Sequence, residues 1–139
     1  MWDGLPFHGT KIALLSPGAV VAYQRDAKEG IPWPGLWDLP GGGREGDESP
    51  VDCALREVEE EFGIRLPLDR VTDVHRYEGA GAGALPSYFC IANITQAEID
   101  TIEFGDEGQC WQIMNPREFV SRPDAVPHMQ VRLARHASF

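Results

Sequence analysis

The sequence has few of the features that mark secreted, membrane or zinc-binding proteins. Its three cysteines, Cys53, Cys90 and Cys110, are odd in number, widely spaced and without a CxxC pair. This pattern argues against a disulfide framework or a zinc site and favours the reducing cytoplasm, with all three thiols buried as small apolar groups. No apolar run approaches the ~20 residues that cross a bilayer, and the N-terminus lacks the basic and long apolar parts of a secretory signal.

Positive charge is scarce as well. The chain has 12 Lys and Arg against 22 Asp and Glu, so its formal net charge is −10. Because contacts with a nucleic-acid backbone come from Lys and Arg, this composition disfavours a nucleic-acid polymer as partner. A small phosphorylated ligand is still compatible if divalent cations bridge the two negative partners, as is the simpler alternative that the charge only maintains solubility. Nothing indicates a membrane partner, and the sequence does not separate a monomer from a homodimer.

No break in composition divides the 139 residues, so we expect one domain, residues 1–139, with one hydrophobic core. Apolar runs bounded by turn residues predict strands over 11–15, 19–25, 70–77, 85–93 and 109–114. Helical patterns cover residues 50–62, 95–102, 116–120 and 129–136. The glycine-rich loop 79–84 is predicted to be a flexible hairpin tip, with an active-site lid as the alternative. The mixture of elements without strict alternation predicts an α+β fold or a mixed-sheet sandwich.

The helix over 50–62 has the clearest boundaries. Ser49 suits the N-cap, Pro50 the first helical position and Gly63 the residue that ends the helix. An apolar stripe at helical spacing is formed by Val51, Ala54, Leu55, Val58 and Phe62. We therefore expect an amphipathic helix packed on the core.

The last turns of this helix carry an unusual acidic cluster. At about 100° per residue, Glu57, Glu60 and Glu61 fall on one face, roughly 125° from the apolar stripe. The like charges at i and i+4 repel, and the helix C-terminus favours cations instead. A solvated acidic face normally mixes charges of both signs, so a bound divalent cation explains the cluster better. Oxygen ligands without His or Cys suit Mg²⁺ or Mn²⁺ and predict metal-assisted phosphate chemistry.

The segment around this helix resembles the Nudix box, G-x5-E-x7-R-E-U-x-E-E-x-G-U with U aliphatic. Every defined position matches from Gly42 to Ile64, so the box covers residues 42–64. The chain is thereby identified as a member of the Nudix hydrolase family, with the MutT-like branch favoured. The resemblance implies an α+β fold of the Nudix type, an α/β/α sandwich with a central mixed β-sheet.

The resemblance also implies roles for the matching residues. It makes Glu60, Glu61 and the Gly41 carbonyl ligands of the metal. Glu57 is implied to be a further ligand or the general base. Arg56 is implied to act in catalysis by orienting these carboxylates.

Residues beyond these carry further implied roles. Three box residues are implied to support the site electrostatically or through turns: Glu48, Gly42 and Gly63. Glu107 lies in a segment similar to the E-G-Q segment of MutT-like enzymes and is a candidate catalytic residue and metal ligand, or else a solvated loop acid. Arg25 lies where MutT-like enzymes contact phosphate; a plain surface arginine is the alternative, and Arg44 is a rival for substrate binding.

The sequence indicates less about the rest of the substrate. Trp33 can stack on a base or sugar, whereas Trp37 is better explained as a structural anchor. The stretch that resembles the base-reading segment of MutT-like enzymes, residues 123–127, has no Asn, and Asp124 is the nearest substitute. Features of the ADP-ribose and dinucleoside polyphosphate branches are also missing. We therefore expect a (d)NTP pyrophosphohydrolase that uses Mg²⁺ and a small-molecule nucleotide, and releases NMP and pyrophosphate.

Other functions are compatible with the same box. They include an ADP-ribose, dinucleoside polyphosphate or nucleotide-sugar pyrophosphatase, and a non-catalytic nucleotide-binding module. An isomerase of the isopentenyl diphosphate type shares the fold, but its cysteine and glutamate constellation is not recognisable here. In the expected reaction, Mg²⁺ neutralises phosphate charge, and a water oriented by Glu57 or Glu107 attacks phosphorus.

Overall fold

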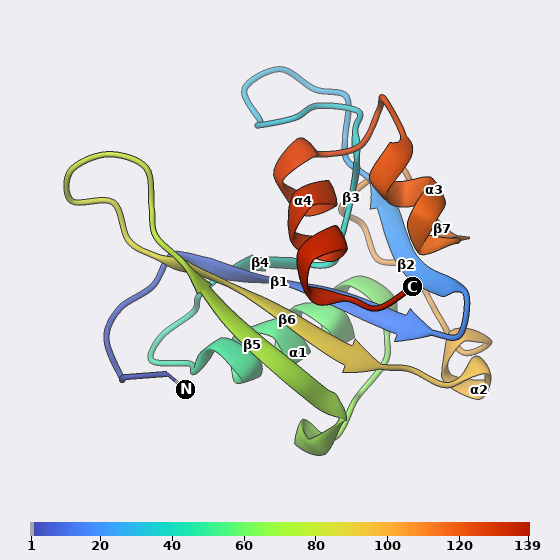
Figure 1. Ribbon diagram of the computed structural model, residues 1–139, viewed down its shortest axis with the longest axis horizontal. Coiled ribbons are helices and arrows are strands. Elements are labelled where there is room, and N and C mark those ends of the chain that lie inside the picture. Colours follow the sequence, from blue (N-terminus) through green and yellow to red (C-terminus); the bar gives the residue numbers. More distant parts are fainter. Residues whose placement is uncertain (1) are drawn as a thin grey trace.

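All strands belong to one mixed sheet in the computed structural model, which describes residues 2–139 (Figure 1). The strands are β1 (Gly9–Ser16), β2 (Ala19–Gln24), β3 (Trp37–Asp38), β4 (Gly41–Gly43), β5 (Val71–Tyr77), β6 (Ser87–Asn93) and β7 (Cys110–Met114). Their order is β3-β2-β1-β6-β5, with β4 paired to β1 and β7 paired to β2. Because β1 and β6 run parallel while neighbouring pairs run antiparallel, the sheet is mixed as predicted.

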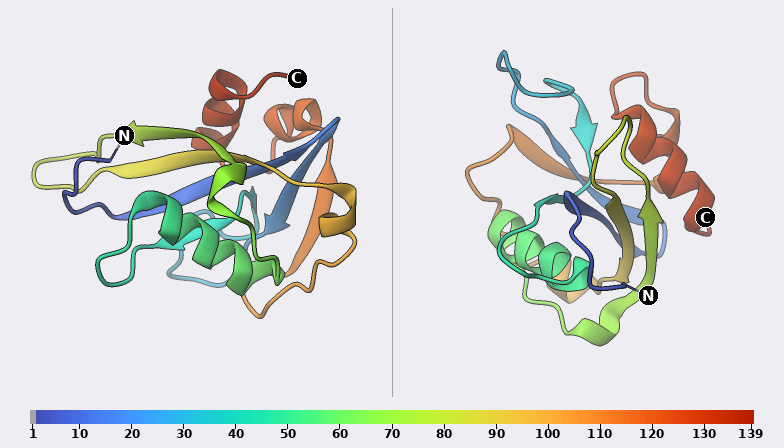
Figure 2. Two further views of the ribbon diagram at one scale, coloured as in Figure 1. Left: turned by 90° about the horizontal axis from the view of Figure 1, so that it is seen from below. Right: turned by 90° about the vertical axis from the view of Figure 1, so that its left-hand side faces the viewer.

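Helices cover both faces of this sheet. They are α1 (Pro50–Phe62), α2 (Gln96–Ile99), α3 (Pro116–Ser121) and α4 (Pro127–His136), with a 3₁₀ turn at Leu68–Arg70. Seen edge-on, α1 lies on one side of the sheet and α3 and α4 lie on the other (Figure 2). The predicted α/β/α sandwich with a central mixed sheet is confirmed.

Alternating side chains of β1 fix the two helical layers. Ile12 and Leu14 pack in the same cluster as Phe62 of α1. Ala13, between them, packs in the cluster that contains Leu133 of α4. Successive side chains of a strand point to opposite faces, so one strand holds α1 and α4 apart on its two sides. Each large apolar side chain buried in this way contributes about 1.5–3 kcal/mol to stability.

The ends of α1 agree with the sequence signals. The Ser49 hydroxyl accepts a hydrogen bond from the Asp52 N–H at 3.1 Å, and Pro50 is the first helical residue. Gly63 ends the helix in the left-handed conformation, with φ of 71°, and its N–H donates to the Glu59 carbonyl. A side chain at residue 63 would be strained there, which explains the glycine.

The strands β1 and β2 stay together only near their tight turn. They pair at two positions beside that turn, Leu15 with Val20 and Ser16 with Ala19. Farther along, β1 pairs with β4, and β2 pairs with β3 and β7. The two strands therefore diverge, and a cleft opens that is lined by residues of both.

The short strands β3 and β4 were not predicted from the sequence. They contain two and three residues and lie between the strand predicted over 19–25 and the helix predicted over 50–62. β3 pairs with β2 and β4 pairs with β1 through backbone hydrogen bonds. Strands of so few residues are too short to show the alternation of apolar and polar residues by which a strand is recognised in a sequence. Other boundaries shift slightly: β6 begins at Ser87 and α4 at Pro127.

The expectation that all three cysteines are buried is wrong for one of them. Cys53 and Cys90 are buried, whereas Cys110 is exposed. Cys110 begins β7, which pairs only with β2 and leaves its other edge unpaired within the described chain. A residue at the start of such a strand has less structure to cover it.

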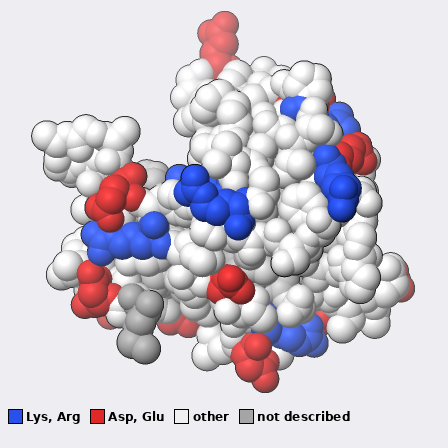
Figure 3. All heavy atoms as spheres, in the orientation of Figure 1, with Lys and Arg blue, Asp and Glu red and all other residues white. Residues whose placement is uncertain are grey.

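The described residues contain no helix with the length and apolar character needed to cross a membrane. The face shown in Figure 3 carries basic side chains in separate places, interspersed with acidic ones, rather than in one continuous basic surface. The loop 79–84 between β5 and β6 projects away from the sheet at the upper left of Figure 1.

Candidate active site

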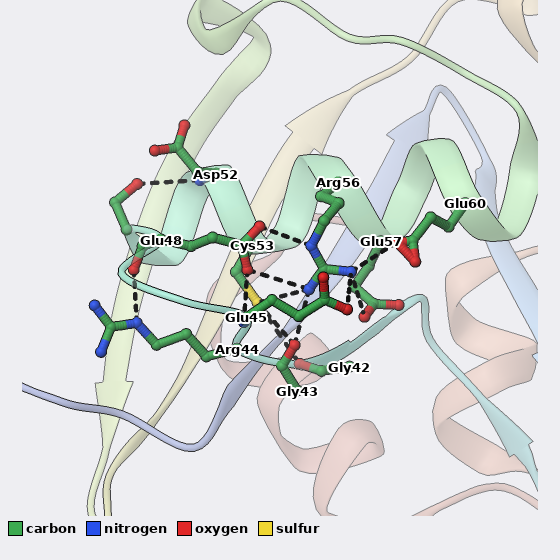
Figure 4. Close-up of polar contacts among 11 residues, drawn as sticks. Gly42, Gly43, Arg44, Glu45, Glu48, Asp52, Cys53, Arg56, Glu57 and Glu60 are labelled. Atoms are coloured by element: carbon green, nitrogen blue, oxygen red, sulfur yellow. Dashed lines mark hydrogen bonds and ion pairs between the residues drawn. The ribbon is translucent and has the colours of Figure 1, made fainter.

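Arg56 of α1 gathers acidic side chains and a backbone carbonyl around one guanidinium group (Figure 4). Its Nε donates to Glu48 Oε2 at 2.7 Å. Its Nη1 donates to Glu60 Oε2 at 2.7 Å and to Glu57 Oε1 at 3.1 Å, and its Nη2 donates to the Gly43 carbonyl at 2.8 Å. The hydrogen bond to Arg56 also lowers the pKa of Glu48 and keeps that carboxylate charged. Arg56 therefore ties α1 to β4 and to the loop between them.

Glu61 is the buried member of the acidic cluster. It is only 6% exposed, and its Oε1 accepts a hydrogen bond from the Gly41 N–H at 2.9 Å. Burial raises the pKa of Glu61 to about 8; Gly41 and Lys11 oppose this shift, and Glu57 and Glu107 add to it. The expectation of an acidic face well away from the packed side of α1 is wrong for Glu61, because β4 packs against α1 and covers this side chain.

Glu57 lies against the glycine-rich strand β4. A Cβ atom placed on Gly42 would lie 2.6 Å from Glu57 Oε1, so only glycine permits this close approach. Burial raises the pKa of Glu57, Arg56 opposes the shift, and Glu60 and Glu107 reinforce it. The closeness of several carboxylates therefore has an electrostatic cost in the protein alone.

The donor set fits a hard divalent cation. Glu60 is 54% exposed and is paired with Arg56. Across residues 2–139, no three His, Cys, Asp or Glu side chains converge closely enough to surround an ion. The available donors are nevertheless all oxygens, which Mg²⁺ and Mn²⁺ prefer. Burial and, to a smaller extent, mutual repulsion raise the pKa values of Glu57 and Glu61, and a cation would offset both effects.

A cleft of about 470 Å³ adjoins this cluster. Its lining includes Gly41–Gly43 from β4, Glu107 from the loop before β7, and His128 and Arg132 from α4. The volume lies within the range of about 300–1,000 Å³ that is typical of small-molecule sites. The acidic residues of α1 reach the cleft across β4, since Glu57 and Glu61 contact its glycines.

A buried ion-pair network lies in the same cleft. The Asp38 side chain is 3% exposed, and its Oδ2 accepts hydrogen bonds from Lys11 Nζ and Arg25 Nη1, each at 2.9 Å. Burial opposes the charge on Lys11, but Asp38, Tyr23 and Glu61 together more than offset this effect, so the pKa of Lys11 is raised. Two cations on one carboxylate leave a net positive charge, which suits a phosphate group.

The cleft includes most of the residues proposed for substrate contact, but not Arg44. Arg25 and Trp33 line it, as does Glu107, the candidate catalytic residue and metal ligand. Arg44 follows β4 and bonds through its N–H to the His8 carbonyl, which turns it toward the N-terminal segment. Its guanidinium lies over two aromatic rings of that segment, at 5.3 and 4.7 Å. Arg44 therefore packs against the N-terminal segment and does not line the cleft.

The other residues considered for contact with the substrate base differ in whether they reach the cleft. Trp37 is 8% exposed and packs in the core, as the structural interpretation predicted. Trp33 is 43% exposed at the cleft. Asp124 pairs with Arg122 and does not line the cleft, so it does not replace a base-reading residue.

The cleft residues that the sequence analysis missed include Lys11, Asp38, His128 and Arg132. A charged residue within an apolar strand pattern, as at Lys11, or beside a buried tryptophan, as at Asp38, is a signal that could have found the first two. His128 and Arg132 are four residues apart and share one face of α4. No motif distinguishes them from an ordinary polar face.

A mixed sheet between helical layers, with an acidic helix and a glycine-rich strand bordering a cleft, defines the class of Nudix-fold proteins. The family model of the NUDIX domain matches residues 9–135. The chain therefore belongs to the Nudix hydrolase family, and the family predicted from the box is confirmed.

Individual relatives agree with this assignment. The chain is 36% identical over 83 residues to a MutT-like protein from Streptomyces ambofaciens, covering 58% of this chain and 50% of that protein. It is 26% identical over 107 residues to diphosphoinositol polyphosphate phosphohydrolase 2 from Mus musculus, covering 77% and 55%. The crystal structure of the Nudix hydrolase RenU from M. smegmatis has a TM-score of 0.71 and 22% identity, covers 96% of this chain and 89% of that one, and supports the fold alone. The chain spans about half the length of the curated relatives it matches.

Proposed function

We propose that the protein is a Mg²⁺-dependent hydrolase that cleaves a phosphoanhydride bond in a nucleoside diphosphate linked to another group. Its proposed substrate is a (d)NTP, which is converted to NMP and pyrophosphate. The observation that carries this proposal is a nucleotide-sized cleft lined by Lys11, Arg25 and the glycines of β4, against which the carboxylates of Glu57 and Glu61 pack. Family membership supports the reaction class, and the likeness to a MutT-like protein supports the triphosphate branch.

The proposed cofactor is Mg²⁺, with Mn²⁺ as a substitute. Five groups would hold the ion or ions: the side chains of Glu57, Glu60, Glu61 and Glu107, and the Gly41 carbonyl. When bound, such an ion supplies charge neutralisation at phosphate oxygens and lowers the pKa of water. This requirement accounts for carboxylates that repel one another in the protein alone.

The chain's own residues bind and orient the reactants. Lys11 and Arg25 bind a phosphate group through charge-assisted hydrogen bonds. Glu57 or Glu107 orients or deprotonates the attacking water. Arg56 is a positioning residue, since its donors are spent on Glu48, Glu57, Glu60 and Gly43 rather than directed at the cleft. Most of the rate enhancement comes from positioning and electrostatic stabilisation.

Substitutions in α1 provide a matched test of this proposal. Glu57→Gln and Glu60→Gln keep side-chain size and remove one charge each. Glu59→Gln is the control, because Glu59 belongs to the same helical turn but pairs with Arg65 outside the cluster. Turnover should fall by orders of magnitude in the first two variants and stay at the parent level in the third.

The assay measures phosphate release with Mg²⁺ at mildly alkaline pH, coupled to a phosphatase or pyrophosphatase. The panel contains dNTPs and NTPs, ADP-ribose, dinucleoside polyphosphates, nucleotide sugars and a diphosphoinositol polyphosphate. The last is included because the mouse relative is named for that substrate. Turnover confined to another class would correct the proposed branch. Nucleotide binding without any turnover would identify a non-catalytic module, and equal rates in all three variants would overturn the role of α1.

A further inference from the structure

Arg132 on α4 is a cation of the cleft that has no acidic partner within the described chain. No hydrogen bond or ion pair joins its guanidinium to residues 2–139, whereas the other two basic residues of the cleft, Lys11 and Arg25, are paired with Asp38. The guanidinium carbon of Arg132 lies 3.9 Å from the centre of the Tyr77 ring. A guanidinium over an aromatic face keeps the N–H donors along its edge free. Arg132 therefore offers the cleft a planar set of unused donors.

Aromatic and apolar groups line the cleft next to Arg132. The ring of Trp33 lies 5.9 Å from that of His128, tilted by 48°. His128 precedes Arg132 by one helical turn, so both side chains leave the same face of α4. Val126 and Met129 add buried apolar surface to the same lining. Burial, with the nearby charge of Arg132, lowers the pKa of His128, so its ring is neutral at pH 7.

The backbone at Trp33 is held in a rarely used conformation. Its φ is 52°, and no other non-glycine residue in the described chain has a positive φ. A bulky residue in this region carries a cost of order 1–3 kcal/mol. The loop accepts this cost and leaves the indole 43% exposed at the cleft rather than packed in the core. An exposed aromatic ring over a cleft is suited to stacking on a flat ligand.

We propose that Arg132 is a specificity-determining residue and that, together with Trp33 and His128, it binds the base of a 6-oxopurine nucleotide. The exposed indole of Trp33 stacks on the base, with the His128 ring packed beside the indole, and the edge of the guanidinium donates paired hydrogen bonds to the adjacent acceptors O6 and N7. Adenine presents an amino donor at position 6, which opposes an arginine donor. The inference rests on the proposed function, since it assigns the cleft to a nucleotide.

The surroundings of Arg132 favour a base over a second phosphate group. His128 adds no charge at neutral pH, and Val126 and Met129 provide apolar surface, which suits a flat ring rather than a hydrated anion. The phosphate end of the ligand is already served by Lys11 and Arg25 and by the proposed metal site. The donors of Arg132 are therefore left for the uncharged edge of the base.

Base selectivity in hydrolysis tests the inference. We expect the parent protein to have a kcat/KM for GTP and for ITP about 10- to 100-fold above that for ATP, the range one bidentate contact provides. ITP is included because it shares O6 and N7 with GTP but lacks the 2-amino group. Arg132→Gln and Arg132→Lys should both lose the preference, because lysine keeps the charge without the planar fork. Arg135→Gln, at an exposed position on the same helix, is the control and should retain it.

Equilibrium binding separates this inference from the proposed reaction. Calorimetry with the α,β-methylene analogues of GTP and ATP needs no turnover. Binding that favours the guanine analogue and loses this selectivity in Arg132→Gln would support the base site even if nothing were hydrolysed. Hydrolysis with equal kcat/KM for GTP and ATP, or a preference unchanged in Arg132→Gln, would overturn the base site alone. An equal loss of affinity for both analogues and for inorganic triphosphate would show that Arg132 binds phosphate and would also overturn it.

Discussion

A single methyl group at residue 42 would displace Glu57 while leaving the surrounding backbone in place. The added Cβ of Gly42→Ala would lie 2.6 Å from Glu57 Oε1 and 2.7 Å from its carboxyl carbon. These atoms are the end of a flexible side chain, so the side chain yields rather than strand β4. Gly42 is not among the glycines with positive φ, and an alanine therefore fits its backbone.

The size of the effect follows from these distances. To reach ordinary contact at 3.4 Å, the Glu57 carboxylate must retreat by about 0.8 Å. A misplacement of about 1 Å in a reacting group can reduce rate about 100-fold. We therefore expect kcat to fall by about two orders of magnitude, while the free energy of unfolding changes by no more than about 1 kcal/mol, as for most substitutions without a core defect.

The neighbouring glycine supplies the control. A Cβ on Gly43 would meet nothing closer than the His8 carbonyl oxygen at 4.0 Å, so Gly43→Ala should keep the parent rate. Initial rates of nucleotide hydrolysis with Mg²⁺ and thermal unfolding would be measured for both variants. A parent rate in Gly42→Ala, or equal losses of rate in the two variants, would refute the positioning of Glu57 by β4.

Three further predictions concern ion pairs. Asp38→Asn should lower the free energy of unfolding, measured in urea, by about 3 kcal/mol, because two cations lose a buried partner. The control is Asp124→Asn, which should lower it by less than about 1 kcal/mol because the Asp124 carboxylate is 47% exposed. Equal losses in the two variants would contradict the argument from burial. Arg56→Lys should slow hydrolysis at least about 10-fold, since one ammonium group does not replace a branched guanidinium; an unchanged initial rate would contradict its positioning role. The hydrogen bond from Arg70 lowers the pKa of Glu98 below its ordinary 4.5, so the stabilisation it provides is complete above that value and is lost as pH falls through the folded-state pKa. Glu98→Gln should therefore flatten the decline of the urea midpoint in this acid range, and a decline as steep as that of the parent would count against the pair.

The parts that the sequence predicted correctly depend on local signals. The boundaries of α1 follow from Ser49, Pro50 and Gly63, which act within a few residues of themselves. The longer strands follow from apolar runs, and the box from residues at fixed spacing in α1 and directly on either side of it. The Nudix-type sandwich could be expected because a family resemblance accompanies that local pattern.

The parts that the sequence did not predict depend on distant contacts. Glu61 is buried because β4 crosses it, and β4 is too short to be recognised without its partner strand. The network of Lys11 and Asp38 exists because β1 and β2 diverge and β3 pairs with β2. The substrate end of the cleft likewise brings α4 beside a loop almost a hundred positions earlier, as the contact of Trp33 with His128 shows.

The proposed function requires the carboxylates of α1 and the cleft beside them to carry out Mg²⁺-dependent hydrolysis. Monitoring GTP hydrolysis with phosphorus NMR, with and without Mg²⁺, tests this requirement. It identifies the products and the metal requirement in one sample, with Glu60→Gln as comparison. We predict that the parent protein forms GMP and pyrophosphate and that EDTA stops the reaction. The variant should be slower by at least about 100-fold, since losing even an outer-shell partner of a metal ligand costs about 10- to 100-fold. A rate independent of Mg²⁺, or one equal in the parent protein and Glu60→Gln, would contradict the proposed mechanism.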